Sequence, residues 1–197
     1  MIRSFRCQET KAICDGYGSR RFRGIEEQAR KRLRWLAAAT SLTDLGAIRG
    51  NRLEALKGDR AGQHSIRIND RWRICFSWRE GNPHDVEIVD YHQERRTMAQ
   101  RRKLPPIHPG ELLRDELDEI GVSLNELGRA LRVPMNRVSA IVNGKRAITV
   151  DTAMRLARYF GTSPQYWLNL QMAYDLEVAG QEIQSRIRKE VLPRTAA

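Results

Sequence analysis

The sequence predicts two successive folds, an α+β module followed by an all-α module. Apolar residues alternate with polar ones, mostly arginines, between residues 66 and 78, which is the period of a strand. Between residues 25 and 37 they recur every three or four positions, which is the period of a helix. From Pro109 onward the apolar spacing is helical throughout. We therefore expect helices packed on a mainly antiparallel sheet, and then a helical domain.

The elements of the first module follow from these periods. We expect a strand at 2–7, a helix at 25–37 and strands at 66–68, 72–78 and 86–91. Asn69 and Asp70 tolerate positive φ, so they suit the tight turn between the second and third strands. The alternation places apolar side chains on one face of this sheet, and Arg67, Arg71 and Arg73 on the other.

A basic segment separates the two modules. It is poor in apolar residues and ends in two consecutive prolines, which is typical of a linker. We therefore divide the chain into a first domain at 1–92, a linker at 93–106 and a second domain at 107–197. A flexible linker of about 14 residues has a reach near 20 Å and would keep the modules at roughly millimolar effective concentration.

The composition favours nucleic acid as a partner. A formal charge of +11 on 197 residues exceeds what solubility requires, and polyanions are the usual partners of such surfaces. The 3 cysteines lack the spacing of a zinc site or a disulfide scaffold, so we expect neither, and a reducing cytoplasm fits. Apolar runs are too short for a membrane span, so no membrane partner is expected.

The second module contains the pattern of a helix-turn-helix. A first helix runs from Pro109 to Glu119, and a capping box at Ser123 and Glu126 starts a second one. Pro134 opens a third helix, which stops at Asn143-Gly144. Two further helices are expected at 151–160 and 163–176, with aromatic residues as core or dimer contacts. They are Tyr159, Phe160, Tyr166 and Trp167, and Leu170 joins them.

The third helix carries the candidate DNA contacts. Its exposed N-terminal residues would meet base edges in the major groove; they are Met135, Asn136, Arg137 and Ser139. Asparagine can pair with adenine, and arginine with guanine, through two hydrogen bonds. Lys145 and Arg146 follow the helix and are placed to contact phosphates.

Residues 110–170 resemble the Cro/repressor-type helix-turn-helix family, in particular the HigA-type antitoxins. The segments that carry the resemblance are HPGELLRDEL, SLNELGRALRVP, VSAIVNGKRAIT and DTAMRLARYFGTSPQYWLNLQ. The resemblance implies binding to operator DNA, repression of its own operon and a homodimer formed through the C-terminal domain.

Residues 1–92 resemble the HigB toxins of the RelE/ParE superfamily, through NRLEALKGDRAGQHSIRIND, RWRICFSW and VEIVDYH. The resemblance implies a RelE-like fold that cuts messenger RNA on the ribosome without a metal or another cofactor. The positions that match functional residues of the family are Lys57, Arg73, Asp90, Tyr91 and His92, which we take as the catalytic candidates. Arg60, Arg67 and Arg71 are the candidates for RNA binding.

Two positions depart from the family pattern. Glu54 stands where some HigB toxins have a catalytic histidine, and Arg71 stands where they have an asparagine. The general base is therefore open; His64 could replace the histidine or be a structural residue, and Asp90 could be a structural partner of an arginine. The linker also follows His92 directly, where it could misplace this residue or block the substrate.

Three functions remain open on the sequence. The first is a self-neutralised toxin–antitoxin fusion, with an RNA-cleaving domain held in check by a DNA-binding repressor. The second is a DNA-binding regulator whose first domain lacks catalysis and acts as a corepressor. The third follows the ParE branch, in which the related fold poisons DNA gyrase.

Overall fold

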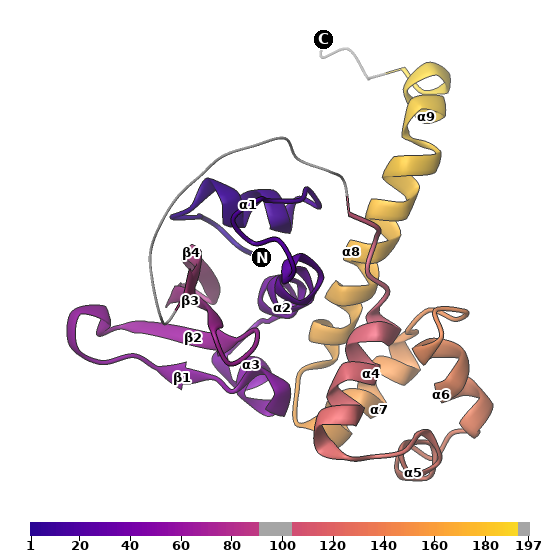
Figure 1. The fold of residues 1–197 in the computed structure, drawn as a ribbon. Helices are drawn as coiled ribbons and strands as arrows, with labels where there is room; N and C mark the ends of the chain where they lie inside the picture. The colour runs from indigo at the N-terminus through magenta and orange to yellow at the C-terminus, as the bar shows by residue number, and fades with distance from the viewer. Residues whose placement is uncertain (91–103, 193–197) are drawn as a thin grey trace.

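The computed structural model describes residues 1–90 and 104–192, and its N-terminal module combines helices with one sheet (Figure 1). The helices are α1 (Gln8–Cys14), α2 (Glu26–Ala38) and α3 (Leu42–Ala47). The strands are β1 (Glu54–Ala55), β2 (Gln63–Arg67), β3 (Trp72–Arg79) and β4 (Asn82–Asp90). They pair antiparallel in chain order, and the 3-10 helices η1 (Arg49–Asn51) and η2 (Gly58–Arg60) flank β1.

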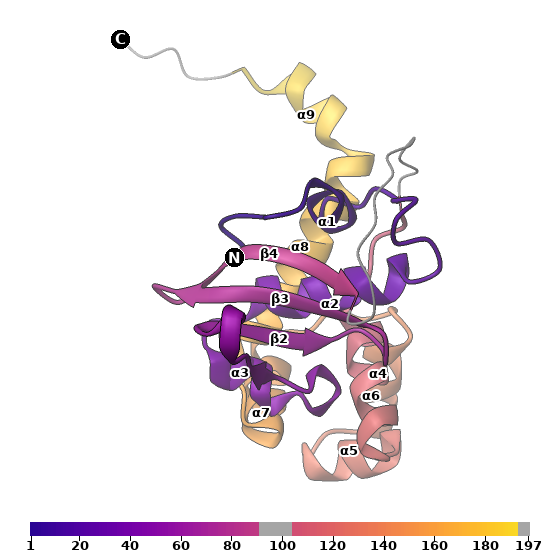
Figure 2. The same cartoon turned by 60° about the vertical axis from the view of Figure 1, so that its left-hand side comes forward.

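One face of the sheet is packed against α2 (Figure 2). Ile66, Ile74 and Ile88 lie opposite one another across β2, β3 and β4, and each is at most 1% exposed. Ala29 and Leu33 lie one turn apart on the buried side of α2. The helix predicted at 25–37 and the three strands predicted between 66 and 91 are therefore confirmed, with small differences at their ends.

Residues 2–7 do not form the regular strand that their apolar pattern predicts. Phe5 makes only an isolated parallel bridge with Val86. Arg6 donates its backbone N–H to Val86 at 3.1 Å, and Val86 donates to Ser4 at 3.0 Å. The ladder stops there because Cys7 is already the N-cap of α1.

The C-terminal module is helical throughout its described residues. Its helices are α4 (Pro109–Ile120), α5 (Leu124–Ala130), α6 (Met135–Val142), α7 (Val150–Phe160), α8 (Pro164–Glu182) and α9 (Gln184–Glu190). The predicted capping box is present at the start of α5, where Ser123 accepts from the backbone of Glu126. The predicted helices are confirmed, although α8 continues well beyond the predicted end at residue 176.

A close approach of two helices fixes the position of α6. Gly110, in the first turn of α4, leaves no room for a Cβ atom because the backbone carbonyl of Ile141 occupies that space. Glycine is therefore required where α4 crosses the end of α6. This contact orients α6, the helix that carries the candidate base contacts.

The two modules share one hydrophobic core. Trp35 of α2 stacks on Tyr166 of α8, with 5.4 Å between ring centroids, and meets Trp167 edge-on at 5.7 Å. Tyr166 and Trp167 are both 0% exposed, and Figure 1 shows α8 alongside α2. Leu104 is also buried and donates its N–H to the carbonyl of Gly16 at 2.6 Å. The C-terminal end of the predicted linker thus packs on the N-terminal module instead of spanning free space.

In the ranges that the structure describes, no helix has the length and apolar character needed to cross a membrane.

Candidate nucleic-acid interfaces

Arg73 is the best-anchored cation on the outer face of the sheet. Its Nε donates to the hydroxyl of Ser65 at 2.9 Å, and its Nη2 donates to the backbone carbonyl of Arg52 at 2.8 Å. The same Nη2 forms an ion pair with Glu54 at 3.1 Å. Only 12% of the Arg73 side chain is exposed, against 55% for Glu54. The guanidinium is therefore fixed beside a carboxylate that solvent, or a substrate, can reach.

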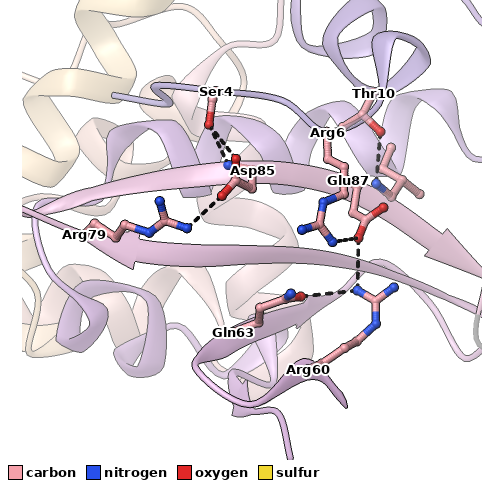
Figure 3. A network of polar contacts seen from close by, with 9 residues as sticks. Ser4, Arg6, Thr10, Arg60, Gln63, Arg79, Asp85 and Glu87 are labelled. Carbon is pink, nitrogen blue, oxygen red and sulfur yellow. Dashed lines mark hydrogen bonds and ion pairs between the residues drawn. The ribbon is translucent and has the colours of Figure 1, made fainter. Parts of the chain in front are cut away.

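Two of the predicted RNA-binding arginines, Arg60 and Arg67, are also paired with carboxylates. Arg60 lies 3.0 Å from Glu87, which also contacts Arg6 at 3.5 Å (Figure 3). Arg67, the cross-strand neighbour of Arg73, forms an ion pair with Asp70. The outer face thus alternates in charge and is not a row of free cations.

Arg71 does not belong to the row in which the alternation places it. It lies in the turn before β3, where the side chain of Asn69 accepts its backbone N–H at 3.0 Å. Its guanidinium donates to Asp90 at 2.8 and 2.6 Å and covers the ring of Trp72 at 5.3 Å. The hydrogen bonds with Asp90 raise the pKa of Arg71.

Asp90 is a structural partner of Arg71, since its side chain is only 2% exposed within that ion pair. Tyr91 and His92, the two catalytic candidates that follow it, lie outside the described residues. Lys57 is exposed in the loop after β1, where it is the N-cap of η2. The structure therefore brings Arg73 and Glu54 together and leaves Asp90 buried at the end of β4.

His64 belongs to the opposite side of the sheet from Arg73. Its ring stacks on Phe76 of the core, with 5.9 Å between centroids. Its Nδ1 is buried and has no hydrogen-bond partner among the described residues. Of the two interpretations of His64, the structural one fits this position.

The DNA-reading candidates are grouped on α6, at the side of the C-terminal module away from the sheet (Figure 1). Met135 and Asn136 are exposed at its N-terminus, and Lys145 and Arg146 are exposed just beyond its end. Ser139 is half-buried and accepts a hydrogen bond from the side chain of Asn143 at 3.2 Å. This arrangement presents an exposed helix terminus followed by two cations.

Arg137 differs from these residues because it is held by another helix. Its Nη1 forms an ion pair with Asp151 of α7 at 2.8 Å, and 29% of its side chain is exposed. The guanidinium is thus partly accessible, and its direction is set by α7 as well as by α6.

The sequence analysis does not predict the ionic cluster at the junction of the modules. Glu177 of α8 pairs with both Arg30 and Arg34 of α2, and the Arg30 side chain is only 1% exposed. Loss of solvent around Arg30 lowers its pKa, and the charge of Glu177 acts against this effect. A signal existed in the sequence, because Arg30 directly follows Ala29 on the buried side of the predicted helix.

Two further carboxylates join the modules through backbone N–H groups. Glu116 of α4 accepts from Arg49 at 2.8 Å and from Gly50 at 3.1 Å, so it caps η1 of the other module. Burial raises the pKa of Glu116. Asp44 of α3 accepts from the N–H of Ser163, the N-cap of α8, at 2.7 Å.

No cluster of three or more histidine, cysteine, aspartate or glutamate side chains that could hold a metal ion is found in residues 1–90 and 104–192.

Two family models match the chain. The model of the RelE-like toxin of type II toxin–antitoxin systems, HigB, matches residues 18–92, and a helix-turn-helix model matches residues 113–167. The chain therefore joins the two components of a type II toxin–antitoxin system in one polypeptide.

Relatives of the C-terminal half define the family further. Antitoxin HigA-1 of Vibrio cholerae is 38% identical over 77 residues, which are 39% of this chain and 72% of the relative. Virulence-associated protein I of Dichelobacter nodosus is 51% identical over 88 residues, 44% of this chain and 82% of the relative. An antidote protein of the HigA family from Coxiella burnetii, of known structure, is 52% identical, with 46% of this chain and 100% of that chain covered and a TM-score of 0.45. The chain belongs to the HigA family, and it is a fusion of the HigB–HigA type.

Proposed function

We propose that this protein is a self-neutralised toxin–antitoxin pair acting in the cytoplasm. Its N-terminal module is a ribosome-dependent ribonuclease for messenger RNA, and its C-terminal module binds operator DNA and represses its own operon. The observation that carries the proposal is the junction, where α8 is packed on α2 through Trp35, Tyr166 and Trp167. The antitoxin module thus holds the toxin module in the same chain.

The outer sheet face supplies groups for the cleavage reaction. In this reaction the 2′-oxygen attacks phosphorus, its proton passes to a base, and the bond to the 5′-oxygen breaks as that oxygen is protonated. Arg73 and Lys57 would stabilise the charge on the phosphoryl oxygens. Glu54 is the accessible carboxylate beside Arg73, so we assign the base to it. We assign substrate positioning and proton transfer to Tyr91 and His92, whereas Asp90 holds Arg71.

Separating the modules tests this proposal. Residues 1–92 expressed alone should arrest growth and produce cleaved messenger RNA, whereas the full chain should do neither. Growth would be followed by optical density, and RNA ends by primer extension on ribosome-associated messages. Arrest with intact RNA and damaged DNA would instead favour the gyrase-directed function.

Pairing of the outer-face arginines favours a second candidate, a DNA-binding regulator whose first module lacks catalysis. Arg60, Arg67 and Arg73 all contact carboxylates, which reduces the positive charge available to RNA. Absence of any phenotype for residues 1–92, at expression levels at which the fragment is folded, would support this candidate.

Two substitutions test the proposed DNA binding of the C-terminal module. Lys145→Ala should weaken binding to all DNA sequences alike and reduce the salt slope by about one, because we assign Lys145 to a phosphate contact. Arg137→Ala should lose about 1–3 kcal/mol of sequence preference, because we assign Arg137 to a base edge. Fluorescence anisotropy with specific and scrambled duplexes, at several salt concentrations, measures both. Equal losses of Arg137→Ala on the two duplexes would contradict its assignment.

The proposal includes a homodimer formed through the C-terminal module. Met172 and Leu176 of α8 are 51% and 67% exposed and lie one helical turn apart, so they present a joint apolar surface to a second copy of the chain. A dimer through the C-terminal module would match the two-fold symmetry of an operator.

A further inference from the structure

A chain of ion pairs ties the DNA-reading helix α6 to its two neighbours. Oδ2 of Asp151 accepts from Nη1 of Arg137 at 2.8 Å, and Oδ1 accepts from Nε of Arg155 at 2.9 Å. Arg155 also donates from Nη1 to the backbone carbonyl of Leu131 at 2.9 Å, where α5 ends. The guanidinium of Arg137, near the start of α6, is therefore connected through Asp151 to the start of α7 and through Arg155 to the end of α5.

The central carboxylate of this chain is charged and accessible. Hydrogen bonds from Arg155, and then its charge and the contacts with Arg137, lower the pKa of Asp151. Asp151 is 53% exposed, so solvent reaches it beside Arg137. By contrast, the side chain of Asn136, the residue before Arg137, shows no hydrogen bond to another described residue.

A carboxylate beside an arginine affects two kinds of DNA binding in opposite directions. Recognition of guanine requires two N–H groups of the guanidinium in one plane, and a carboxylate bound to Nη1 restricts the directions that the guanidinium can take. The same carboxylate repels phosphates, so it weakens binding that does not depend on sequence. A carboxylate that only neutralised the arginine would weaken binding without adding preference.

We propose that Asp151 is a positioning residue for sequence readout, which restrains the guanidinium of Arg137 so that its remaining N–H groups meet a guanine edge in the major groove. The inference rests on the proposed DNA-binding function, and it adds a residue outside the helix-turn-helix contacts to those that determine specificity. Asp151 acts through Arg137 and need not touch DNA itself.

The test uses the full chain and two DNA duplexes. One carries a sequence that the unmodified protein selects from a random pool, and the other is its scrambled version. Dissociation constants for both are measured at several salt concentrations for Asp151→Asn, Arg137→Ala and the double variant. Asp118→Asn, an exposed carboxylate of α4 with no ion pair among the described residues, is the matched control. Thermal unfolding by circular dichroism shows that each variant is folded.

Asp151→Asn should reduce the ratio of specific to scrambled affinity by about 5- to 20-fold, while affinity for scrambled DNA stays equal or rises up to about 3-fold. The double variant should show the ratio of Arg137→Ala alone, because the two residues act as one unit. An unchanged ratio with tighter binding to both duplexes, or independent effects in the double variant, would overturn the inference. Failure of the unmodified protein to select any sequence would instead contradict the proposed function itself.

Discussion

Arg73→Ala, introduced into residues 1–92, is expected to reduce RNA cleavage by about 10²- to 10³-fold. This is the loss typical when a fixed donor to the developing charge of a transition state is removed. Three interactions fix the guanidinium of Arg73, with Ser65, the Arg52 carbonyl and Glu54. Because the donor is already oriented, little reorganisation is needed when the phosphorane forms. Single-turnover cleavage of a message on purified ribosomes measures the effect.

Arg79 provides the matched control for this variant. It lies on the same strand and forms an ion pair with Asp85 at 2.9 Å (Figure 3). The Arg79 side chain is 61% exposed. Arg79→Ala should therefore cleave like the unmodified fragment. Arg73→Lys separates charge from geometry, because lysine keeps the charge but cannot make the paired contacts, and it should fall between the two. A fully active Arg73→Ala fragment would show that the site is misplaced.

The fold could be predicted where the signal is local. The helix α2 and strands β2–β4 follow from apolar periods within a few residues, and the start of α5 follows from the capping box at Ser123 and Glu126. The turn before β3 shows the limit of such patterns. The side chain of Asn69 accepts from the backbone of both Arg71 and Trp72. Arg71 is therefore held in the turn and does not join Arg67 and Arg73 on the outer face, although β3 begins at Trp72 as predicted.

The site was predictable in its residue types and less so in its pairings. The arginines of the outer face are visible in the sequence as an alternating set. The carboxylates that pair with them come from other strands, such as Glu54 on β1 and Glu87 on β4, and only the sheet register brings them together. The contacts that join the modules are even less visible to local patterns, because Arg30 and Glu177 are 147 residues apart in the sequence.

Glu177→Ala is expected to weaken the junction by about 3 kcal/mol, because it leaves a buried cation without its charged partner. The Arg30 side chain is 1% exposed, and Glu177 is the carboxylate that contacts it and Arg34. About 3 kcal/mol corresponds to a roughly 100-fold rise in the open form of the chain. Urea unfolding measured by tryptophan fluorescence reports the change, since Trp35 and Trp167 both lie at the junction.

Glu190→Ala is the control on the same C-terminal arm. Among the described residues, Glu190 forms a single ion pair, at the surface with Arg186 at 3.8 Å, so its loss should change stability by less than about 1 kcal/mol. Adding Arg30→Met to Glu177→Ala should restore most of the lost stability, because an apolar side chain of similar length needs no counter-charge. A Glu177→Ala chain as stable as the unmodified one would mean that the aromatic contacts alone hold the modules. Growth arrest by the full-length Glu177→Ala variant should remain weak, because the covalent connection keeps the antitoxin module at high local concentration.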